Sequence, residues 1–489
     1  MNTALVLVPI LVPVAIAALY AAVGWRPGGT AWAGLLATAL VAADAIALAA
    51  TVTRHGPVRA AGGWLRADAL SAWMLLGIGA VAVLACWASP AYLAAAPEPA
   101  TPRRTRWYGT LLQLFIAAMA TAVLAGNLGV LWVAVEATTI VTAFLVGHHR
   151  TRTALEAAWK YVVICSAAIA IALLGLVLLY DAARHAGLDG AHALDWSVLA
   201  THAHTLDPAV TRIAIGLAVL GFGAKAGLVP LHAWLPDAHS QAPAPVSALM
   251  SGVLLPVALY AVLRLKTVAD PALGTGYLRT LLLIMALATL ALATLLLIGQ
   301  RDYKRMLAYS SMEHMGLIAL AAAVGTRLAI AALLLHMAGH GLAKTVAFLS
   351  SGHILHHHPS SRIADVHALA SRMPLLAGLF AAAVLALLGF PPAALFASEL
   401  AIARAGASAG LGWAIAAALI LVAIAFAALT VHSGRMLLGP RDPSTAPSTG
   451  ITRRAALPLI AGLLGVTALG ITIGPLSDLL NAAALAGAP

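Results

Sequence analysis

The chain has 489 residues, of which 62% are hydrophobic and only 9% are charged. A soluble domain carries about 25% charged residues, so this chain lacks the polar side chains that a surface facing water requires. The composition excludes a soluble globular enzyme and indicates an integral membrane protein. The formal net charge of +11 is attributed to cationic loops and not to nucleic-acid binding, because Lys and Arg mostly lie between apolar runs.

Apolar runs of about 20 residues follow one another along the chain, and each is long enough to cross a hydrocarbon core about 30 Å thick as a helix. The predicted fold class is an all-α polytopic membrane protein with about 14 transmembrane helices. The first run lacks a basic leader and is predicted to be a retained span. The predicted spans are 3–23, 30–51, 67–88, 108–125, 127–147, 156–180, 209–229, 243–265, 277–299, 304–324, 326–353, 374–400, 408–432 and 455–480.

Charge is distributed unevenly between the loops. The first, third, fifth and later odd-numbered loops hold most of the Arg and Lys residues, whereas the longest even-numbered loop, 181–208, holds four aspartates. By the positive-inside rule the odd loops face the cytoplasm. We therefore expect a multi-pass protein of the cell inner (plasma) membrane with both termini outside the cytoplasm.

The chain carries few signs of chemistry of its own. Cys86 and Cys165 both fall inside apolar runs, which disfavours a disulfide framework or a cysteine metal cluster. The HExxH signature and glycine-rich phosphate loops are missing from the sequence. The histidine-rich run HILHHHP, 353–359, is predicted to be a solvated loop. We expect no cofactor and no metal, so that any redox centre belongs to a partner.

Two of the ionisable residues inside predicted spans are flanked by apolar runs. Glu136 lies in LWVAVEATTIVTAF and Lys225 in LGFGAKAGLVP. Such groups are costly at membrane depth and by default mark ion or proton paths. The alternatives are a packing hydrogen bond for Glu136 and snorkelling to the interface for Lys225.

A break in the helix is predicted just after Lys225. Four prolines follow it within twenty residues, at positions 230, 236, 243 and 245, and no straight helix tolerates that density. Backbone groups freed at membrane depth survive only inside protein or along a wet cavity. The side chains expected to line that site or its mouth, each with a structural polar contact as the alternative, are His232, Asp237, His239 and Ser240.

The second half of the chain has a matching break, where Gly389, Pro391 and Pro392 precede Glu399. Two proline-interrupted spans suggest duplicated units, as in inverted-repeat transporters.

His336, His340 and Lys344 lie between the breaks at i, i+4 and i+8, so they share one helix face. We favour a proton relay toward Lys344 over core hydrogen bonding. Zinc is disfavoured because no third ligand accompanies the pair. In QRDYKRMLAYSSMEHMG, Glu313 and His314 extend the polar line inward.

Three segments carry a resemblance to a known family: KAGLVPLHAWLPDAHSQAPAPVSALMSGVLL, DYKRMLAYSSMEHMG and HMAGHGLAKTVAFLSSGHI. They resemble the proton-translocating, antiporter-like subunits of respiratory complex I and its Mrp relatives. VEATTIVTAFLVGHHR followed by LEAAWKYVVICS makes the chain most similar to the F subunit of hydrogenase-4 and formate hydrogenlyase complexes. The resemblance spans about residues 105 to 400.

The resemblance implies two inverted five-helix repeats with broken helices 7 and 12. The implied units are 1–105 with helices 1–3, 106–266 with helices 4–8, 267–432 with helices 9–13, and 433–489 with helix 14. Glu136, Lys225, Lys344 and Glu399 fall on ionisable positions of the family. The sequence departs at Pro256, where some complex I subunits carry a lysine, and this leaves the face of helix 11 to bridge the two halves.

We therefore predict a proton-translocating subunit of a redox-driven complex, of hydrogenase or quinone oxidoreductase type. Its expected partners are other membrane subunits, a soluble arm of hydrogenase-like or iron–sulfur subunits, and the lipid bilayer, without nucleic acid. The alternatives are a subunit of a cation/proton antiporter or of a proton-driven inorganic carbon uptake system, and a scaffold that has lost pumping. The predicted proton path comprises Glu136, Lys225, His232, His239, His336, His340, Lys344 and Glu399.

Overall fold

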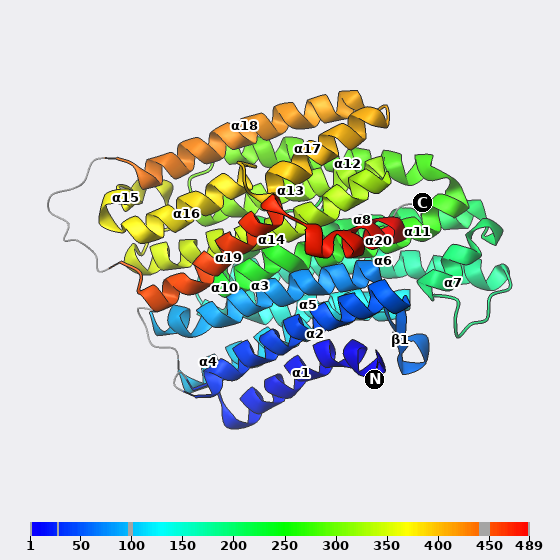
Figure 1. The fold of residues 1–489 in the computed structure, drawn as a ribbon, viewed down its shortest axis with the longest axis horizontal. Helices are drawn as coiled ribbons and strands as arrows, with labels where there is room; N and C mark the ends of the chain where they lie inside the picture. The colour runs from blue at the N-terminus through cyan, green and yellow to red at the C-terminus, as the bar shows by residue number, and fades with distance from the viewer. Residues whose placement is uncertain (1, 27–28, 96–100, 440–449, 488–489) are drawn as a thin grey trace.

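The computed structural model describes residues 2–26, 29–95, 101–439 and 450–487, and it is an elongated bundle of helices that run side by side (Figure 1). Within these ranges, 13 helical segments are long and apolar enough to cross a membrane. A further crossing is built from two shorter helices. The predicted all-α polytopic fold is confirmed.

The first three long helices pack beside one another, and a small antiparallel hairpin precedes the third. Asp68 caps the third helix by accepting a hydrogen bond from the backbone N–H of Ser71. These elements are α1 (Asn2–Val23), α2 (Ala33–His55), β1 (Val58–Ala60), β2 (Leu65–Ala67) and α3 (Ala69–Ala94).

The next group contains the first broken crossing. The helix α8 ends at Lys225, and the chain is not helical again until α9 begins at Trp234. The elements are α4 (Pro102–Leu124), α5 (Leu128–Val146), α6 (Arg152–His185), α7 (Trp196–Thr201), α8 (Pro208–Lys225), α9 (Trp234–Gln241), α10 (Ala244–Leu249), a π-helical turn (Met250–Leu254) and α11 (Leu255–Leu273).

The remaining group contains the second broken crossing, between α16 and α17 around Gly389, Pro391 and Pro392. The elements are α12 (Thr275–Ile298), α13 (Tyr303–Val324), α14 (Arg327–His357), α15 (Leu369–Arg372), α16 (Pro374–Leu387), α17 (Ala394–Ser408), α18 (Gly412–Leu437), α19 (Arg453–Ile471) and α20 (Ser477–Gly487). Both breaks thus fall where the prolines predict them.

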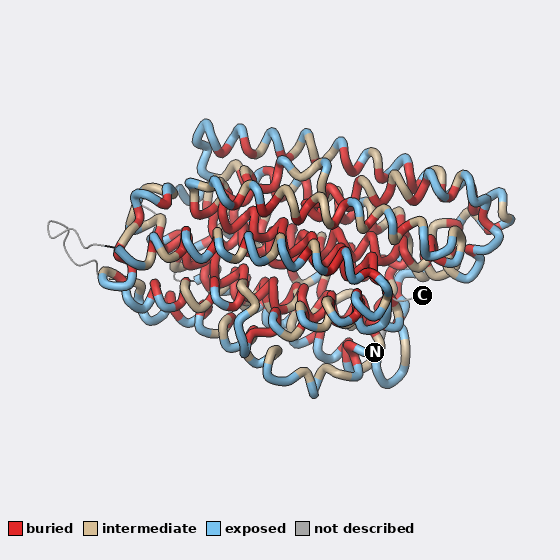
Figure 2. The backbone as a smooth tube through the Cα atoms, turned by 90° about the horizontal axis from the view of Figure 1, so that it is seen from above, coloured by how far each residue is buried: buried red, intermediate tan, exposed pale blue. Residues whose placement is uncertain are grey.

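The core of the bundle is formed by the 244–273 segment, α13 and α14. Their most apolar windows are buried by 100%, 100% and 89%, whereas those of α1 and α18 are buried by only 28% each. Figure 2 shows this as a buried interior surrounded by exposed helix faces. Large apolar side chains such as Trp159 and Leu464 cover the exterior, as expected of a surface that faces lipid. Polar residues on α13 and α14 are therefore held far from water.

Two predictions about helix ends are wrong. The span expected at 455–480 is interrupted, because α19 ends at Ile471 and a short 3₁₀ turn containing Pro475 separates it from α20. The run His353–Pro359 is not a solvated loop, because α14 continues to His357 and His353 is buried within it. The prediction failed because it used only the polarity of this run, which carries no information about the neighbouring helices that cover this end of α14.

The helix α1 begins and α20 ends at the same end of the bundle, and α7 lies at that end as well (Figure 1). A chain that crosses a membrane an even number of times begins and ends on the same side. Both termini are therefore on one side of the membrane, together with the long loop that contains Asp189 and Asp195.

Candidate functional site

Lys225 is fully buried at the last residue of α8. Its Nζ donates hydrogen bonds to Thr139 Oγ1 on α5 at 2.8 Å and to Tyr161 Oη on α6 at 2.6 Å. It also lies 4.5 Å from the centroid of the Tyr161 ring and 5.9 Å from that of Trp234. The amine is held by neutral hydroxyls and aromatic faces, and within the described part of the chain it contacts no carboxylate.

Glu136 lies one turn before Thr139 on α5. Its Oε1 accepts a hydrogen bond from Ser166 Oγ on α6 at 3.0 Å, and its Oε2 is buried without a partner among the described residues. The described side chains form no direct ion pair between Glu136 and Lys225. Thr139 links them along α5, because it accepts from Lys225 and lies three residues after Glu136.

The break that follows Lys225 places the two predicted histidines differently. His232 is half-buried and bonds only to the carbonyl of Pro230, at 3.2 Å. His239, on α9, is fully buried, and neither of its ring nitrogens has a hydrogen-bond partner in the described structure. Its ring lies 6.1 Å from Trp234 and 5.7 Å from Phe348 of α14. His239 therefore lies between the Lys225 site and α14, while His232 stays at the edge.

Asp237, also on α9, joins the two halves of the bundle. Its carboxylate pairs with Lys160 of α6 at 3.1 Å and with Arg305 of α13 at 2.8 Å. Both cations are partly exposed, so each pair alone contributes little stability. The two ion pairs instead fix a position, because they hold the short helix α9 against α6 of the first half and α13 of the second half.

Lys344 is the second fully buried lysine and lies on α14. Its Nζ donates to the backbone carbonyl of Leu307 at 2.8 Å and forms a short hydrogen bond with Ser310 Oγ, both on α13. Like Lys225, it has no carboxylate in contact within the ranges that the structure describes.

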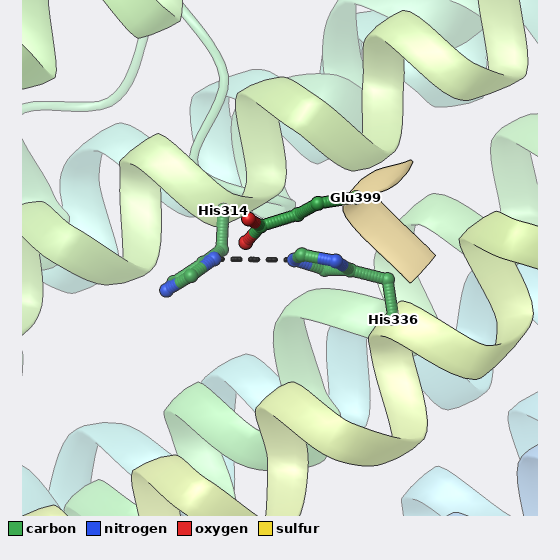
Figure 3. Close-up of side chains that lie close together, drawn as sticks. All are labelled: His314, His336 and Glu399. Atoms are coloured by element: carbon green, nitrogen blue, oxygen red, sulfur yellow. Dashed lines mark hydrogen bonds between the residues drawn. The ribbon is translucent and has the colours of Figure 1, made fainter. Parts of the chain in front are cut away.

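Three histidines of α13 and α14 form a cluster next to this lysine in the bundle. His336 and His340 of α14 face His314 of α13, and a 3.1 Å hydrogen bond joins His314 Nδ1 to His336 Nε2. The His340 ring centroid lies 5.0 Å from that of His314. The Glu399 carboxylate of α17 lies beside the His314 and His336 rings (Figure 3). The predicted shared face of α14 thus meets both α13 and the second broken crossing.

A cavity of about 40 Å³ adjoins this cluster, lined among others by Ser310, Glu313 and Glu399. A water molecule needs a probe-occupied volume of about 10–15 Å³ and polar partners. The cavity therefore has room and acceptors for water next to Glu399.

Pro256 does not line the cavity beside Glu399. It borders a larger cavity of about 290 Å³ whose other walls are apolar side chains of α2, α3, α14 and α19, including Trp73, Met337 and Leu469. On the opposite side of the same segment, Ser251 Oγ bonds to Ser311 Oγ of α13 at 2.8 Å. The π-helical turn that precedes Pro256 is thus linked to α13 through two hydroxyls.

A buried ion pair lies outside the predicted path. Arg264 of α11 donates to both oxygens of Asp68, at 2.7 and 2.6 Å, and its guanidinium lies 4.0 Å from the Trp196 ring centroid. Burial raises the pKa of the Asp68 carboxyl, but Arg264 opposes this more strongly, and the net pKa is lowered. The two complementary hydrogen bonds hold this ion pair in one geometry, whereas Lys225 and Lys344 bond only to neutral hydroxyl and carbonyl groups.

Sequence reasoning did not select several residues that complete the site: Thr139, Tyr161, Ser166, Ser310 and Ser398. Hydroxyl side chains are common in membrane helices and often bond to their own backbone. No local signal separates those that bond to a lysine or histidine of another helix. His314 had a signal, since it was expected to extend the polar line, and the structure places it at the centre of the cluster.

Residues 125–425 match the family model described as NADH:quinone oxidoreductase/Mrp antiporter, TM. The chain is 38% identical over 381 residues to the hydrogenase-4 component F homolog of Methylacidiphilum infernorum (isolate V4), covering 77% of this chain and 78% of the relative. It is 34% identical over 366 residues to NADH-quinone oxidoreductase subunit N of Desulforudis audaxviator (strain MP104C), covering 73% and 70%. A chain in the structure of the membrane-bound sulfane sulfur reductase (MBS), an archaeal respiratory membrane complex, superposes with a TM-score of 0.87 at 26% identity, covering 99% of this chain and 97% of that chain.

Proposed function

The chain belongs to the NADH:quinone oxidoreductase/Mrp antiporter transmembrane family, and from this premise we propose that it moves protons through the residues described above. The resemblance inferred from the sequence is confirmed. The chain is an antiporter-like membrane subunit of the type found in hydrogenase and quinone oxidoreductase complexes.

One observation carries the proposal: buried and half-buried ionisable side chains lie at intervals through the middle of the bundle, between the two broken crossings. The line begins at Glu136 and Lys225, passes His239, reaches Lys344 and the histidines, and ends at Glu399. Two buried lysines without a carboxylate in contact are expensive to maintain. A role in loading and releasing protons explains why the chain keeps them.

The proposed mechanism is electrostatic. A charge change in a neighbouring redox-driven subunit moves Glu136 toward or away from Lys225. At an effective dielectric constant of about 20, a change in separation from about 4 to about 10 Å alters the interaction by about 2–3 kcal/mol. That is roughly a hundredfold change in the proton affinity of the lysine, enough to expel its proton toward Lys344.

We further propose that the crossings form two inverted five-helix repeats, within 106–266 and 267–432, flanked by units 1–105 and 433–489. The two breaks, α8/α9 and α16/α17, occupy matching places in these units. Each break brings irregular backbone to an ionisable group, the fully buried Lys225 in one and the half-buried Glu399 in the other.

The proposed partners are other membrane subunits and a soluble arm of hydrogenase-like or iron–sulfur subunits. Affinity purification of the full chain from its native membrane in mild detergent, followed by identification of the co-purifying subunits, tests this. Hydrogenase-like subunits support the proposal. Several small antiporter subunits, or a zinc protein of the carbonic anhydrase kind, would instead support cation exchange or inorganic carbon uptake.

The purified complex, reconstituted in vesicles with a pH-sensitive dye, should acidify or alkalinise the lumen only while the redox reaction runs. Redox turnover in tightly sealed vesicles without any proton movement would refute the proposed function.

We propose that both termini face away from the cytoplasm of the cell inner membrane, because the cations concentrate in the odd loops. A reporter inserted after Arg150 should be cytoplasmic, and one inserted near Asp189 should be external. The reverse pattern at both sites would overturn this orientation.

A further inference from the structure

The histidine cluster contains a set of ligands that no single helix reveals. One donor atom each from His314, His336 and Glu399 lies within 4.8 Å of the other two (Figure 3). They come from three helices: α13 and α14 are consecutive in the chain, and α17 follows beyond α15 and α16. Imidazole and carboxylate together suit Zn²⁺ and related transition metals, whereas Mg²⁺ and Ca²⁺ prefer oxygen alone.

A second observation points to a ligand at the same place. His340 is fully buried beside His314, and neither of its ring nitrogens has a hydrogen-bond partner among the residues that the structure describes. A buried polar group without a partner costs about 1–3 kcal/mol. An unpartnered buried imidazole beside the three donor atoms indicates that the polar contacts of this place are incomplete.

The spacing and the outer contacts also fit a metal. In tetrahedral Zn²⁺ sites with bonds of 2.0–2.1 Å, neighbouring ligand atoms lie about 3.3 Å apart, close to the 3.1 Å between His314 Nδ1 and His336 Nε2. Ligating histidines usually bond outward through the other nitrogen. Here His336 Nδ1 contacts Ser398 Oγ at 2.9 Å, and His314 Nε2 lies 3.7 Å from Glu313 Oε2.

We propose that His314, His336 and Glu399, with His340 beside them, bind a divalent transition metal of the Zn²⁺ class. The zinc site disfavoured from the spacing on α14 becomes plausible because the missing ligands come from α13 and α17. A bound metal occupies the nitrogens that would pass a proton, so it closes the path at this point. That consequence rests on the proposed function, whereas metal binding does not.

Co²⁺ is a suitable probe because its visible absorption reports tetrahedral coordination. The test uses the full chain, purified in mild detergent, with His356, His357 and His358 replaced by Asn so that the end of α14 does not contribute sites. We expect one Co²⁺ per chain, displaced by Zn²⁺. His336→Gln and Glu399→Gln should each weaken binding at least about tenfold.

His432→Asn is the matched control. His432 is a buried histidine of α18 that bonds to the Leu297 carbonyl at 3.0 Å, outside the cluster, so this variant should bind Co²⁺ as the parent does. Thermal unfolding of each purified variant identifies any that fail to fold, and Glu399→Gln, which keeps size and shape, provides the test if His336→Gln fails. Absence of Co²⁺ binding in the parent, or equal binding in both ligand variants, would overturn the metal site.

A second measurement separates the metal site from the proton path. Zn²⁺ added to vesicles containing the complex should inhibit proton movement, and a chelator should restore it. Ser398→Ala keeps the three ligands but removes the outer contact of His336, so the Zn²⁺ concentration that inhibits this variant, relative to its own uninhibited rate, should rise by about 10–100-fold. Metal binding without inhibition would support the site and refute its place on the proton path.

Discussion

In the first half of the bundle Lys225 donates to Thr139 and Tyr161, whereas in the second half Lys344 donates to the Leu307 carbonyl and to Ser310. Both lysines are fully buried. They differ in what lies beyond the first contact. Thr139, which accepts from Lys225, lies one helical turn from the carboxylate of Glu136 on α5, whereas Lys344 has a group of histidines that ends at Glu399.

This difference assigns different tasks to the two halves. A lysine close to a movable carboxylate responds to a small displacement, because their interaction is steep at short range. Histidines in mutual contact can pass a proton onward, since imidazole both donates and accepts. The first half is therefore suited to sense a charge change and the second half to conduct a proton.

The largest effect should come from neutralising the sensing pair. Lys225→Ala and Glu136→Gln should each reduce proton translocation in vesicles to background, because either change removes the interaction that releases the proton. Co-purification of the partner subunits verifies assembly. Thr139→Ser, which keeps the hydroxyl that accepts from Lys225, should retain most of the activity. An assembled Lys225→Ala complex that pumps normally would refute the assignment.

The conducting half should fail almost as completely when one histidine is removed. His340→Ala should lower pumping to within a few per cent of background, an order-of-magnitude expectation for loss of a relay group. His432→Asn, which changes a buried histidine outside the cluster, should pump like the parent. Normal pumping by an assembled His340→Ala complex would place the path elsewhere.

An intermediate effect is expected where the two halves are fastened together. Asp237→Asn removes the charge that pairs with Lys160 and Arg305, and it should reduce pumping severalfold while leaving redox turnover intact. A double-mutant cycle with Arg305→Gln should give a coupling of about 0.5–3 kcal/mol. Strictly additive effects would mean that this contact does not couple the halves.

The smallest effect is expected at Pro256. Its surroundings are an apolar cavity of about 290 Å³ and not the polar line, so Pro256→Lys should be tolerated or mildly harmful and should not raise the pumping rate. Proton movement per electron, measured in the same vesicles, is the readout. A marked gain would show that the path passes through the 244–273 segment and not through α14.

Composition and the repeated apolar runs determined the class of fold by themselves, because a bilayer allows few ways to bury a backbone. The two breaks could also be predicted from the local sequence, because proline removes a helix hydrogen bond in any tertiary arrangement. Lys225, Lys344 and Glu399 stood out because a charge in an apolar run is costly in any arrangement.

The tertiary structure decided which groups meet. It placed Thr139 and Tyr161 around Lys225 in place of a direct ion pair with Glu136, and it brought His314 from α13 and Glu399 from α17 to the histidines of α14. It also paired Asp68 with Arg264, nearly two hundred positions apart. Helix spacing fixes only which residues share a face. Which face meets which depends on how helices distant in sequence pack, and that information is not local.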